Sequence, residues 1–213
     1  MSKVLVIYAH PETAKGSSTH ELYKHFISEY TNANPEDEII MHNVSEYMPY
    51  PLNKIAVSIY NKSLAKSDLN ADESRFNDAR QKWIDEFVQA DKYVFVNPMY
   101  NMFLPAEMKS YIDMVMQAHA TFHYDQNGMS IGDLHGKKAI HLQACGGNYH
   151  NDRSNPDSEI KDLGNQYLKM MLHIMGVNNF STVFAEGMDK DPMNAIAILD
   201  HAYQRAEKAG QEF

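Results

Sequence analysis

Three loops of this chain carry residues whose types and spacing suit the binding of a ligand. The first loop follows an apolar run at residues 3–8 and contains His10, then Ser17, Ser18 and Thr19 at the start of a helical pattern. Hydroxyls and free backbone N–H groups at a helix N-terminus, where the helix dipole is positive, suit a phosphate monoester dianion. Neither a GxxxxGK[ST] loop nor a GxGxxG loop is present. We therefore expect a mononucleotide phosphate here, with simple helix capping as the structural alternative.

The second loop, residues 97–105, places an amide and bulky rings directly after a buried strand. Such a segment is a poor turn, and we expect it to form a shelf for a flat heterocycle. The side-chain amide of Asn101 suits the acceptor and donor edge of such a ring, while Tyr100 or Met102 lies against its face. The residues of the predicted shelf are Pro98, Met99, Tyr100, Asn101 and Met102. The alternative is that the aromatic and methionine side chains of this loop fill the core.

The third loop, residues 143–150, contains the adjacent glycines Gly146 and Gly147, which indicate that backbone approaches something closely. Backbone N–H groups between Ala144 and Gly147 suit donation to the polar edge of a bound ring. A glycine pair also simply makes a turn in many proteins. Cys145 is either a reactive thiol or, as a lone cysteine beside a buried strand, a small inert core residue.

Strands and helices must position these loops, and the chain alternates between the two. Short β-rich runs predict strands at residues 3–8, 92–97, 138–143 and 180–185, with a weaker fifth at 38–42. Helical spacing occupies residues 18–31, 72–90, 105–119, 158–175 and 192–209. This alternation predicts an α/β fold, a five-stranded parallel doubly wound sheet with helices on both faces. Ligands of such sheets bind at the carboxyl ends of the strands, where the three loops should meet.

Local signals set several boundaries along the chain. Residues 48–71, rich in Asn, Ser and Lys, indicate a long and partly ordered excursion that forms part of a lid or dimer contact. Residues 121–124 and 129–131, joined through Asn127-Gly128, predict a small β-hairpin. The helix signals are Pro105 at a start, Gly176 at an end, and Ser18 with Glu21 as a capping box.

Composition narrows the class of protein. The 213 residues, 44% of them hydrophobic, suit one domain spanning residues 1–213. A formal charge of −9 leaves no broad basic surface for nucleic acid. A single cysteine cannot form an internal disulfide, and no apolar run has the length of a signal peptide core or membrane span. We therefore expect a cytoplasmic protein that binds neither nucleic acid nor membrane.

Eleven histidines raise the question of a metal site. His20 and His25 are five residues apart, not four as in the HExxH motif, so they point to different faces of a helix. His119 and His123 are four residues apart but straddle a predicted helix end. We expect surface or core-edge roles for these side chains and no bound metal.

Five motifs follow one another between residues 98 and 187. They are Pro98-Met99-Tyr100-Asn101, the Thr121-Phe122-His123-Tyr124 hairpin with Asn127-Gly128, Gly136-Lys137-Lys138-Ala139-Ile140, Gly146-Gly147, and Val183-Phe184-Ala185-Glu186-Gly187. In this order they resemble the FMN-dependent NADH-azoreductases of the flavodoxin-like NAD(P)H:quinone oxidoreductase superfamily. The segment Tyr8-Ala9-His10-Pro11 is more similar to the quinone reductase branch.

The resemblance implies a flavodoxin-like homodimer with FMN sites at the subunit interface. NADH or NADPH would reduce the FMN and leave before a quinone or azo acceptor enters, a ping-pong hydride transfer through flavin N5 that needs no catalytic side chain. Tyr124 would shape the mouth over the ring as a substrate-site residue, and Tyr149 or His150 would face the N1/O2 edge. The implied FMN contacts are His10, Ser17, Ser18 and Thr19 for the phosphate, Pro98 to Met102 for the ring, and Ala144, Cys145, Gly146 and Gly147 for its polar edge.

Two departures and two alternatives accompany this resemblance. Met102 stands where the azoreductases usually have Phe, and Ala144-Cys145 where they have Ser-Arg, which bears on acceptor preference. A flavodoxin-like electron carrier or a non-catalytic FMN-binding domain is the first alternative, although a minimal carrier needs no additions such as residues 48–71. A phosphate-ester hydrolase is the second, and it lacks a visible base–nucleophile pair. The physiological acceptor and the choice between NADH and NADPH stay open.

Overall fold

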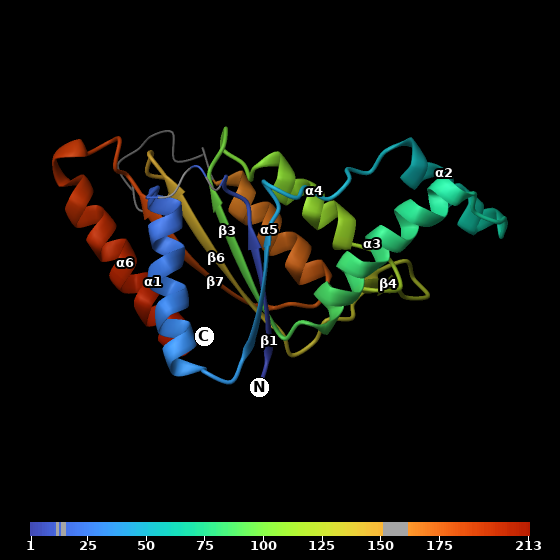
Figure 1. Cartoon of the computed structure of the whole chain (residues 1–213), viewed down its shortest axis with the longest axis horizontal. Helices are drawn as coiled ribbons and strands as arrows, with labels where there is room; N and C mark the ends of the chain where they lie inside the picture. Colours follow the sequence, from blue (N-terminus) through green and yellow to red (C-terminus); the bar gives the residue numbers. More distant parts are fainter. Residues whose placement is uncertain (12, 14–15, 151–161) are drawn as a thin grey trace.

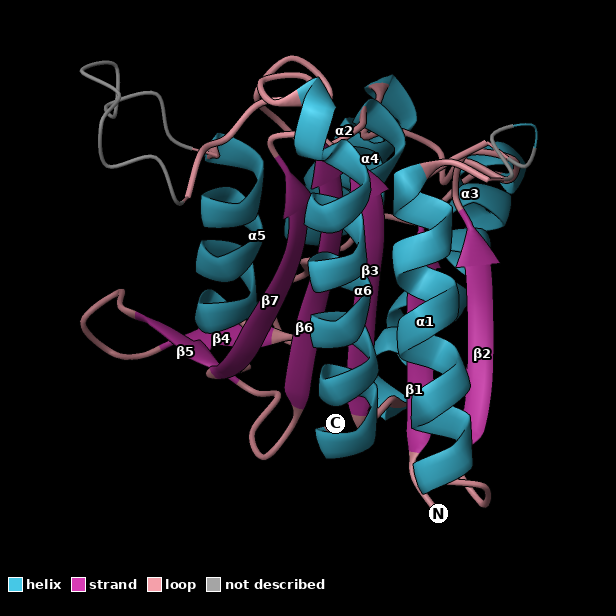
Figure 2. Ribbon diagram, turned by 90° about the vertical axis from the view of Figure 1, so that its left-hand side faces the viewer, coloured by secondary structure: helices cyan, strands magenta, loops and turns pink. Residues whose placement is uncertain are grey.

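Five parallel strands form the central sheet (Figure 1), and their order is β2-β1-β3-β6-β7 (Figure 2). The computed structural model describes residues 1–11, 13, 16–150 and 162–213. The strands are β1 (Lys3–Tyr8), β2 (Glu38–Asn43), β3 (Lys92–Pro98), β6 (Lys138–Cys145) and β7 (Asn179–Glu186). All five predicted strands are confirmed. Since β1 pairs with β2 on one side and β3 on the other, the strand order reverses between β1 and β3. Open α/β sheets bind ligands at such a switch point.

Helices cover both faces of the sheet, as predicted. They are α1 (Ser18–Ala33), α2 (Lys54–Ala65), α3 (Ala71–Gln89), α4 (Ala106–Val115), α5 (Leu163–Ile174) and α6 (Ala195–Glu212), which follows the 3-10 turn η2 (Pro192–Asn194). Helices α1 and α6 lie side by side on one face, and α3, α4 and α5 cover the other (Figure 2). None of the helices in the described part of the chain is long and apolar enough to cross a bilayer.

Two separate cores lie on the two faces of the sheet. In β1, Val4 and Val6 pack with the α1 and α6 side chains, while Leu5 and Ile7 pack with those of α3, α4 and α5. All four side chains are fully buried. A strand covered on both faces must be apolar at consecutive positions, which explains why β1 was recognisable as a continuous apolar run.

Some predicted helix ends differ from the structure. Helix α1 is capped by Ser17, whose Oγ accepts from the His20 N–H, so the capping box predicted for Ser18 and Glu21 is wrong by one residue. Helix α4 ends at Val115, not at residue 119, because the Thr121 hydroxyl accepts from the Gln117 N–H and draws the chain into a turn. Helix α5 begins behind its cap Asp162, and residues 158–161 of the predicted range lie outside the described residues. Gly176 follows the end of α5 with φ +97°, as predicted.

Helix α2 corrects the prediction of a partly ordered excursion at residues 48–71. The Asn53 side chain caps it by accepting from the next helical N–H groups. Glu73 of α3 accepts from the Ser58 hydroxyl at 2.7 Å and the Lys62 ammonium at 2.7 Å, which fixes α2 against α3. The polar composition concealed the helix, and these two contacts to α3 are polar as well. Its apolar side chains Val57, Tyr60 and Leu64 face outward and are exposed.

The predicted hairpin is confirmed as β4 (Phe122–Tyr124) and β5 (Ser130–Gly132). Asp125 organises its turn by accepting from the N–H groups of Asn127 and Met129, and Gly128 adopts φ +78°. Gly132 packs against backbone at the C-terminal end of α5, so the hairpin lies well away from the carboxyl ends of the strands (Figure 2).

Candidate active site

Backbone hydrogen bonds bring the three loops into one row at the carboxyl edge of the sheet. The Ala9 N–H donates to the Val96 carbonyl at 2.8 Å, which places the first loop beside β3. The Met99 N–H donates to the Ala144 carbonyl at 3.0 Å, which joins the second loop to the third. The Gly187 N–H then donates to the Gly147 carbonyl at 2.8 Å and joins the third loop to the end of β7. The three loops therefore meet across the switch point.

His10 and Ser17 lie in contact in the first loop, at the N-terminus of α1. His10 Nε2 lies 2.8 Å from Ser17 Oγ, and the same oxygen accepts from His20 N, so Ser17 both caps the helix and holds His10. Burial and then the nearby His20 lower the pKa of His10, so its imidazole is neutral at pH 7. His10 Nδ1 is buried and has no hydrogen-bond partner in the described structure. Ser18 and Thr19 follow in the first helical turn, half-buried and buried respectively.

The second loop is a tight turn, contrary to the expectation of a poor turn. Tyr100 and Phe103 exchange two backbone hydrogen bonds of 3.0 Å. Between them Asn101 and Met102 both have left-handed φ values, +49° and +66°, as in the two-residue type I′ turn in which Asn is favoured. Tyr100 is 46% exposed, so it does not fill the core, whereas Phe103 packs against Tyr167. Pro98 and Met99 are half-buried at the end of β3.

The two glycines of the third loop make room for neighbouring side chains. A Cβ on Gly146 would collide with the carboxylate of Asp189, and one on Gly147 would meet the Tyr149 ring at 2.8–2.9 Å. The predicted close approach of backbone is thus confirmed. The Tyr149 side chain lies over Gly147 at the carboxyl edge.

His150 points in another direction from Tyr149. Its ring stacks on Phe184 with centroids 3.8 Å apart, and its Nδ1 lies 2.8 Å from Glu186 Oε2. Burial alone would raise the pKa of Glu186, but hydrogen bonds from His150 and the Tyr149 N–H outweigh that effect and lower it. Glu186 is therefore an anion that holds His150 against β7.

The Cys145 thiol is not activated. Burial, followed by the negative charges of Glu186, Asp162 and Asp189, raises its pKa to about 12. Its Sγ lies 3.6 Å from the Gly147 carbonyl oxygen. A thiol that stays protonated at neutral pH is a poor nucleophile, which favours the interpretation of Cys145 as an inert packing residue.

A buried polar network beneath the second and third loops was not predicted. Asn97 Nδ2 donates to the Pro98 carbonyl at 3.0 Å and to Gln143 Oε1 at 3.3 Å, and its Oδ1 lies 3.0 Å from His141 Nε2. Gln143 in turn donates to Asp162, the N-cap of α5. The sequence does contain a sign of this network, because each of two apolar strands has a polar residue near its carboxyl end. These residues, Asn97 and Gln143, are paired in the sheet. The network ties both loops to the start of α5.

Comparison with known proteins agrees with this fold. A family model described as "Flavodoxin-like fold" matches residues 2–209. The chain belongs to this flavodoxin-like family. This match confirms the predicted fold class, and the named relatives confirm the predicted resemblance.

The relatives of this flavodoxin-like protein match it over their whole length and have related names. It is 36% identical over 214 residues to "FMN-dependent NADH:quinone oxidoreductase 2" of Lactiplantibacillus plantarum, and both chains are covered completely. It is 36% identical over 217 residues to the protein of the same name in Bacillus subtilis, again over both whole chains. The crystal structure of a Bacillus anthracis FMN-dependent NADH-azoreductase in complex with FMN superposes with a TM-score of 0.90 at 29% identity, covering 100% of this chain and 99% of that one.

Tyr124 is the predicted site residue that the fold does not bring to the three loops. It lies on β4 of the flavodoxin-like chain, 59% exposed, with its ring 5.5 Å from that of Phe122. The hairpin packs at the C-terminal end of α5, whereas the third loop contacts the N-terminal end. Within one chain, Tyr124 therefore cannot cover the site.

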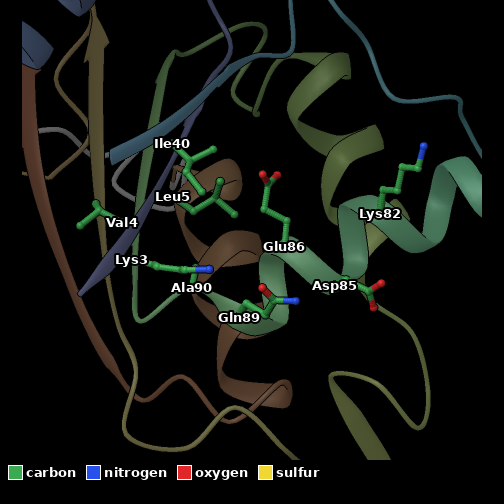
Figure 3. Close-up of a pocket in the computed structure, with 9 residues that line it drawn as sticks. All are labelled: Lys3, Val4, Leu5, Ile40, Lys82, Asp85, Glu86, Gln89 and Ala90. Carbon is green, nitrogen blue, oxygen red and sulfur yellow. The ribbon is translucent and has the colours of Figure 1, made fainter. Parts of the chain in front are cut away.

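A hollow of about 290 Å³ lies at the other end of the sheet, between α3 and the first residues of β1 (Figure 3). Figure 3 shows Glu86 on the strand side of α3, near Leu5 and Ile40, and its carboxylate is bonded to His42. Because this hollow lies away from the carboxyl ends, it takes no part in the three-loop site. In the described segments, no group of three His, Cys, Asp or Glu side chains is arranged to hold a metal ion.

Proposed function

We propose that this protein is an FMN-dependent NADH:quinone oxidoreductase that also reduces azo compounds. The observation that carries the proposal is the meeting of a neutral, donor-rich helix N-terminus with two further loops at the switch point of the sheet. The names of full-length relatives at 33–36% identity support the same activity.

The orphaned nitrogen of His10 supports a bound phosphate. Ser17 Oγ already accepts from His20 N, so its O–H is available to donate to His10 Nε2. Nδ1 then carries the proton and is a buried donor that lacks an acceptor in the described structure. Buried donors are rarely left without a partner, and a phosphate oxygen would satisfy this one. We assign the FMN phosphate to His10, Ser18 and Thr19 and to the backbone N–H of Ser17, whose hydroxyl already donates to His10.

The other two loops would hold the ring of the cofactor. Residues 98–102 would line the isoalloxazine, with Tyr100 exposed to stack on it, and residues 144–147 would offer backbone N–H groups to its polar edge. Tyr149, which lies over Gly147, is better placed to face the ring than His150, which Glu186 and Phe184 hold against β7. Bound FMN supplies the two-electron redox chemistry, accepting hydride from NADH and returning it to the acceptor.

The first experiment is a visible spectrum of the purified protein, followed by release and identification of the flavin. Steady-state NADH oxidation with menadione or methyl red then tests turnover, with NADPH as the comparison donor. We expect a yellow protein that turns over both acceptors without another protein. A colourless preparation that takes up no added FMN would overturn the cofactor assignment, and negligible turnover by a yellow protein would favour the electron carrier.

We further propose a homodimer in which each subunit completes the other's site. The exposed apolar face of α2, formed by Val57, Tyr60 and Leu64, supports an interface, and Tyr124 needs a second copy to reach a flavin. Sedimentation should give twice the chain mass. Coexpression of Tyr124→Ala chains with Ser17→Ala chains should give mixed dimers with one intact site. A mixed dimer whose activity equals the mean of the two variant homodimers would contradict shared sites.

We also infer that the chain acts as one domain, residues 1–213, in the cytoplasm. The single cysteine with its raised pKa suits a reducing compartment. Fractionation of cells that express the protein tests the location, and its recovery outside the cytoplasmic fraction would contradict it.

A further inference from the structure

A second hollow of about 390 Å³ lies outside the three-loop site, between the connection from β2 to α2 and the outer side of α3. Small-molecule sites usually measure about 300–1,000 Å³. This hollow therefore has room for a molecule of one or two rings. Its residues take no part in the proposed flavin contacts.

The walls of this hollow are aromatic and sulfur-containing. Phe76, Trp83 and Met114 form the inner wall, where Phe76 and Met114 are buried. Tyr47 and Tyr50 form an exposed rim, and the Tyr50 ring lies 6.1 Å from that of Phe76. Aromatic rings prefer offset or edge-to-face partners, and methionine sulfur packs well against them. The shape and chemistry of the walls favour a flat aromatic ring.

One cation, Arg80, faces this hollow from α3 and has no anionic partner. Its Nε donates to the Met114 carbonyl at 3.1 Å, in the last turn of α4, and this is the one hydrogen bond of Arg80 in the described part of the chain. No described carboxylate forms an ion pair with it, and Glu46 lies on the exposed rim. Burial lowers the pKa of Arg80. By contrast, the exposed Arg75 on the same helix is paired with Asp72.

We propose that this hollow is a binding site for small aromatic carboxylates. The ring would lie against Phe76, Trp83 and Met114, and the carboxylate would accept from the terminal amino groups of Arg80. A half-buried guanidinium without an anion is costly, and its planar fork matches a carboxylate with two parallel hydrogen bonds. The inference rests on the geometry of α3 and α4 and does not require the proposed flavin activity.

The sequence provides a direct reporter for this site. Trp83 is the one tryptophan in the chain and lies in the wall of the hollow. A bound ring in contact with it should change the intrinsic tryptophan emission. Benzoate and benzamide form a matched pair of probes, since they share the ring and differ in charge. Titration of the full-length protein, as purified, with each probe should show benzoate binding at least about tenfold more tightly than benzamide.

Two variants locate the effect. Arg80→Met should weaken benzoate binding by about tenfold or more and leave benzamide binding unchanged, because only the charge-assisted hydrogen bonds are lost. Arg75→Met, on the exposed face of the same helix, should behave as the unmodified protein. Because Arg80 also bonds to the end of α4, thermal unfolding of Arg80→Met is measured in parallel, and Arg80→Lys provides a second variant that keeps the charge and should retain a preference for benzoate.

Several results would overturn the proposal. Equal affinities for benzoate and benzamide would show that the charge of the ligand plays no part in binding. An unchanged preference for benzoate in folded Arg80→Met would show that Arg80 does not bind the carboxylate. No change in emission with either probe at tens of millimolar would mean that the hollow is closed in solution or covered by a second copy of the chain.

Discussion

The two ends of the sheet use polar groups in opposite ways. At the amino ends of the strands, Asp37 accepts from the Tyr30 hydroxyl at 2.6 Å and from Lys92 at 3.1 Å, and Lys138 lies 4.6 Å from the Phe213 ring centroid. We call these five residues the amino-end cluster, in which Asp37 and Lys92 form an ion pair and the Lys138 ammonium lies over an aromatic ring. At the carboxyl ends, His10 is neutral and keeps an unpartnered buried nitrogen. Beside its satisfied network at Asn97 and Gln143, the carboxyl end therefore keeps one buried nitrogen available to a ligand.

The largest expected effect comes from breaking the amino-end cluster. Asp37→Asn removes the anion beside Lys92, a side chain that is only 12% exposed. Loss of one partner of a buried ion pair leaves the other uncompensated, so we expect a loss of about 3 kcal/mol in the free energy of unfolding. Urea unfolding measures it, and NADH oxidation by the remaining folded protein should be unchanged. The exposed pair of Asp72 and Arg75 provides the control, since Asp72→Asn should cost about 0.5 kcal/mol or less.

The same cluster predicts how stability depends on pH. The hydrogen bond from Tyr30, against the opposing effect of burial, and then those from Ser2 N and Lys92 lower the pKa of Asp37 from 3.8 to about 2. A depressed folded pKa contributes stability that is present above the unfolded pKa and is lost as the carboxylate protonates. The difference in unfolding free energy between the unmodified protein and Asp37→Asn should be constant above about pH 4 and shrink between pH 4 and 2. A constant difference down to pH 2 would contradict the shift.

A smaller effect is expected at the carboxyl end from Ser17→Ala. The variant loses the α1 cap, about 1 kcal/mol of stability, and releases His10. We expect FMN affinity to fall by about tenfold, since hydrogen bonds to a charged group contribute about 1.5–3 kcal/mol. Flavin fluorescence titration of the apoprotein measures it. Ser28→Ala, at an exposed position of the same helix, should leave the affinity unchanged, and equal losses in both variants would mean that the helix, not the cap, matters.

Cys145→Ala should have the smallest effect. With its pKa raised to about 12, the thiol carries almost no thiolate at pH 8. We expect turnover within about twofold of the unmodified protein, and slow reaction of the native protein with iodoacetamide. Rapid alkylation with loss of activity would show that the thiol is exposed and activated.

The sequence predicted the parts of the fold that depend on simple patterns. The five strands were visible because two-sided burial requires consecutive apolar residues, and the hairpin because Asn127-Gly128 tolerates a tight turn. Helix α2 was missed because its connection to α3 depends on polar contacts of Glu73. The partners, Lys62 and Ser58, lie 11 and 15 positions before Glu73 in the sequence. Hydrophobic periodicity does not indicate such a polar contact.

The site was predicted at the level of loops but not of individual side chains. The carboxyl ends of β1, β3 and β6 had to meet because the sheet is parallel. The direction of each side chain depended on backbone details, such as the left-handed pair Asn101 and Met102, and on partners distant in sequence, such as Glu186 for His150. The position of the hairpin, and hence of Tyr124, depended on Gly132 packing against the end of α5. Spacing along the chain does not encode these relations.

The division of the interior into two cores has a consequence for how the protein tolerates change. Val6 and Ile7 are neighbours in sequence, yet their side chains belong to different layers separated by the backbone of the sheet. Substitutions that lie more than about 7–10 Å apart and share no partners usually combine additively. Each layer can therefore accumulate compensating replacements independently, so drift or redesign beneath α1 and α6 leaves the packing beneath α3, α4 and α5 intact.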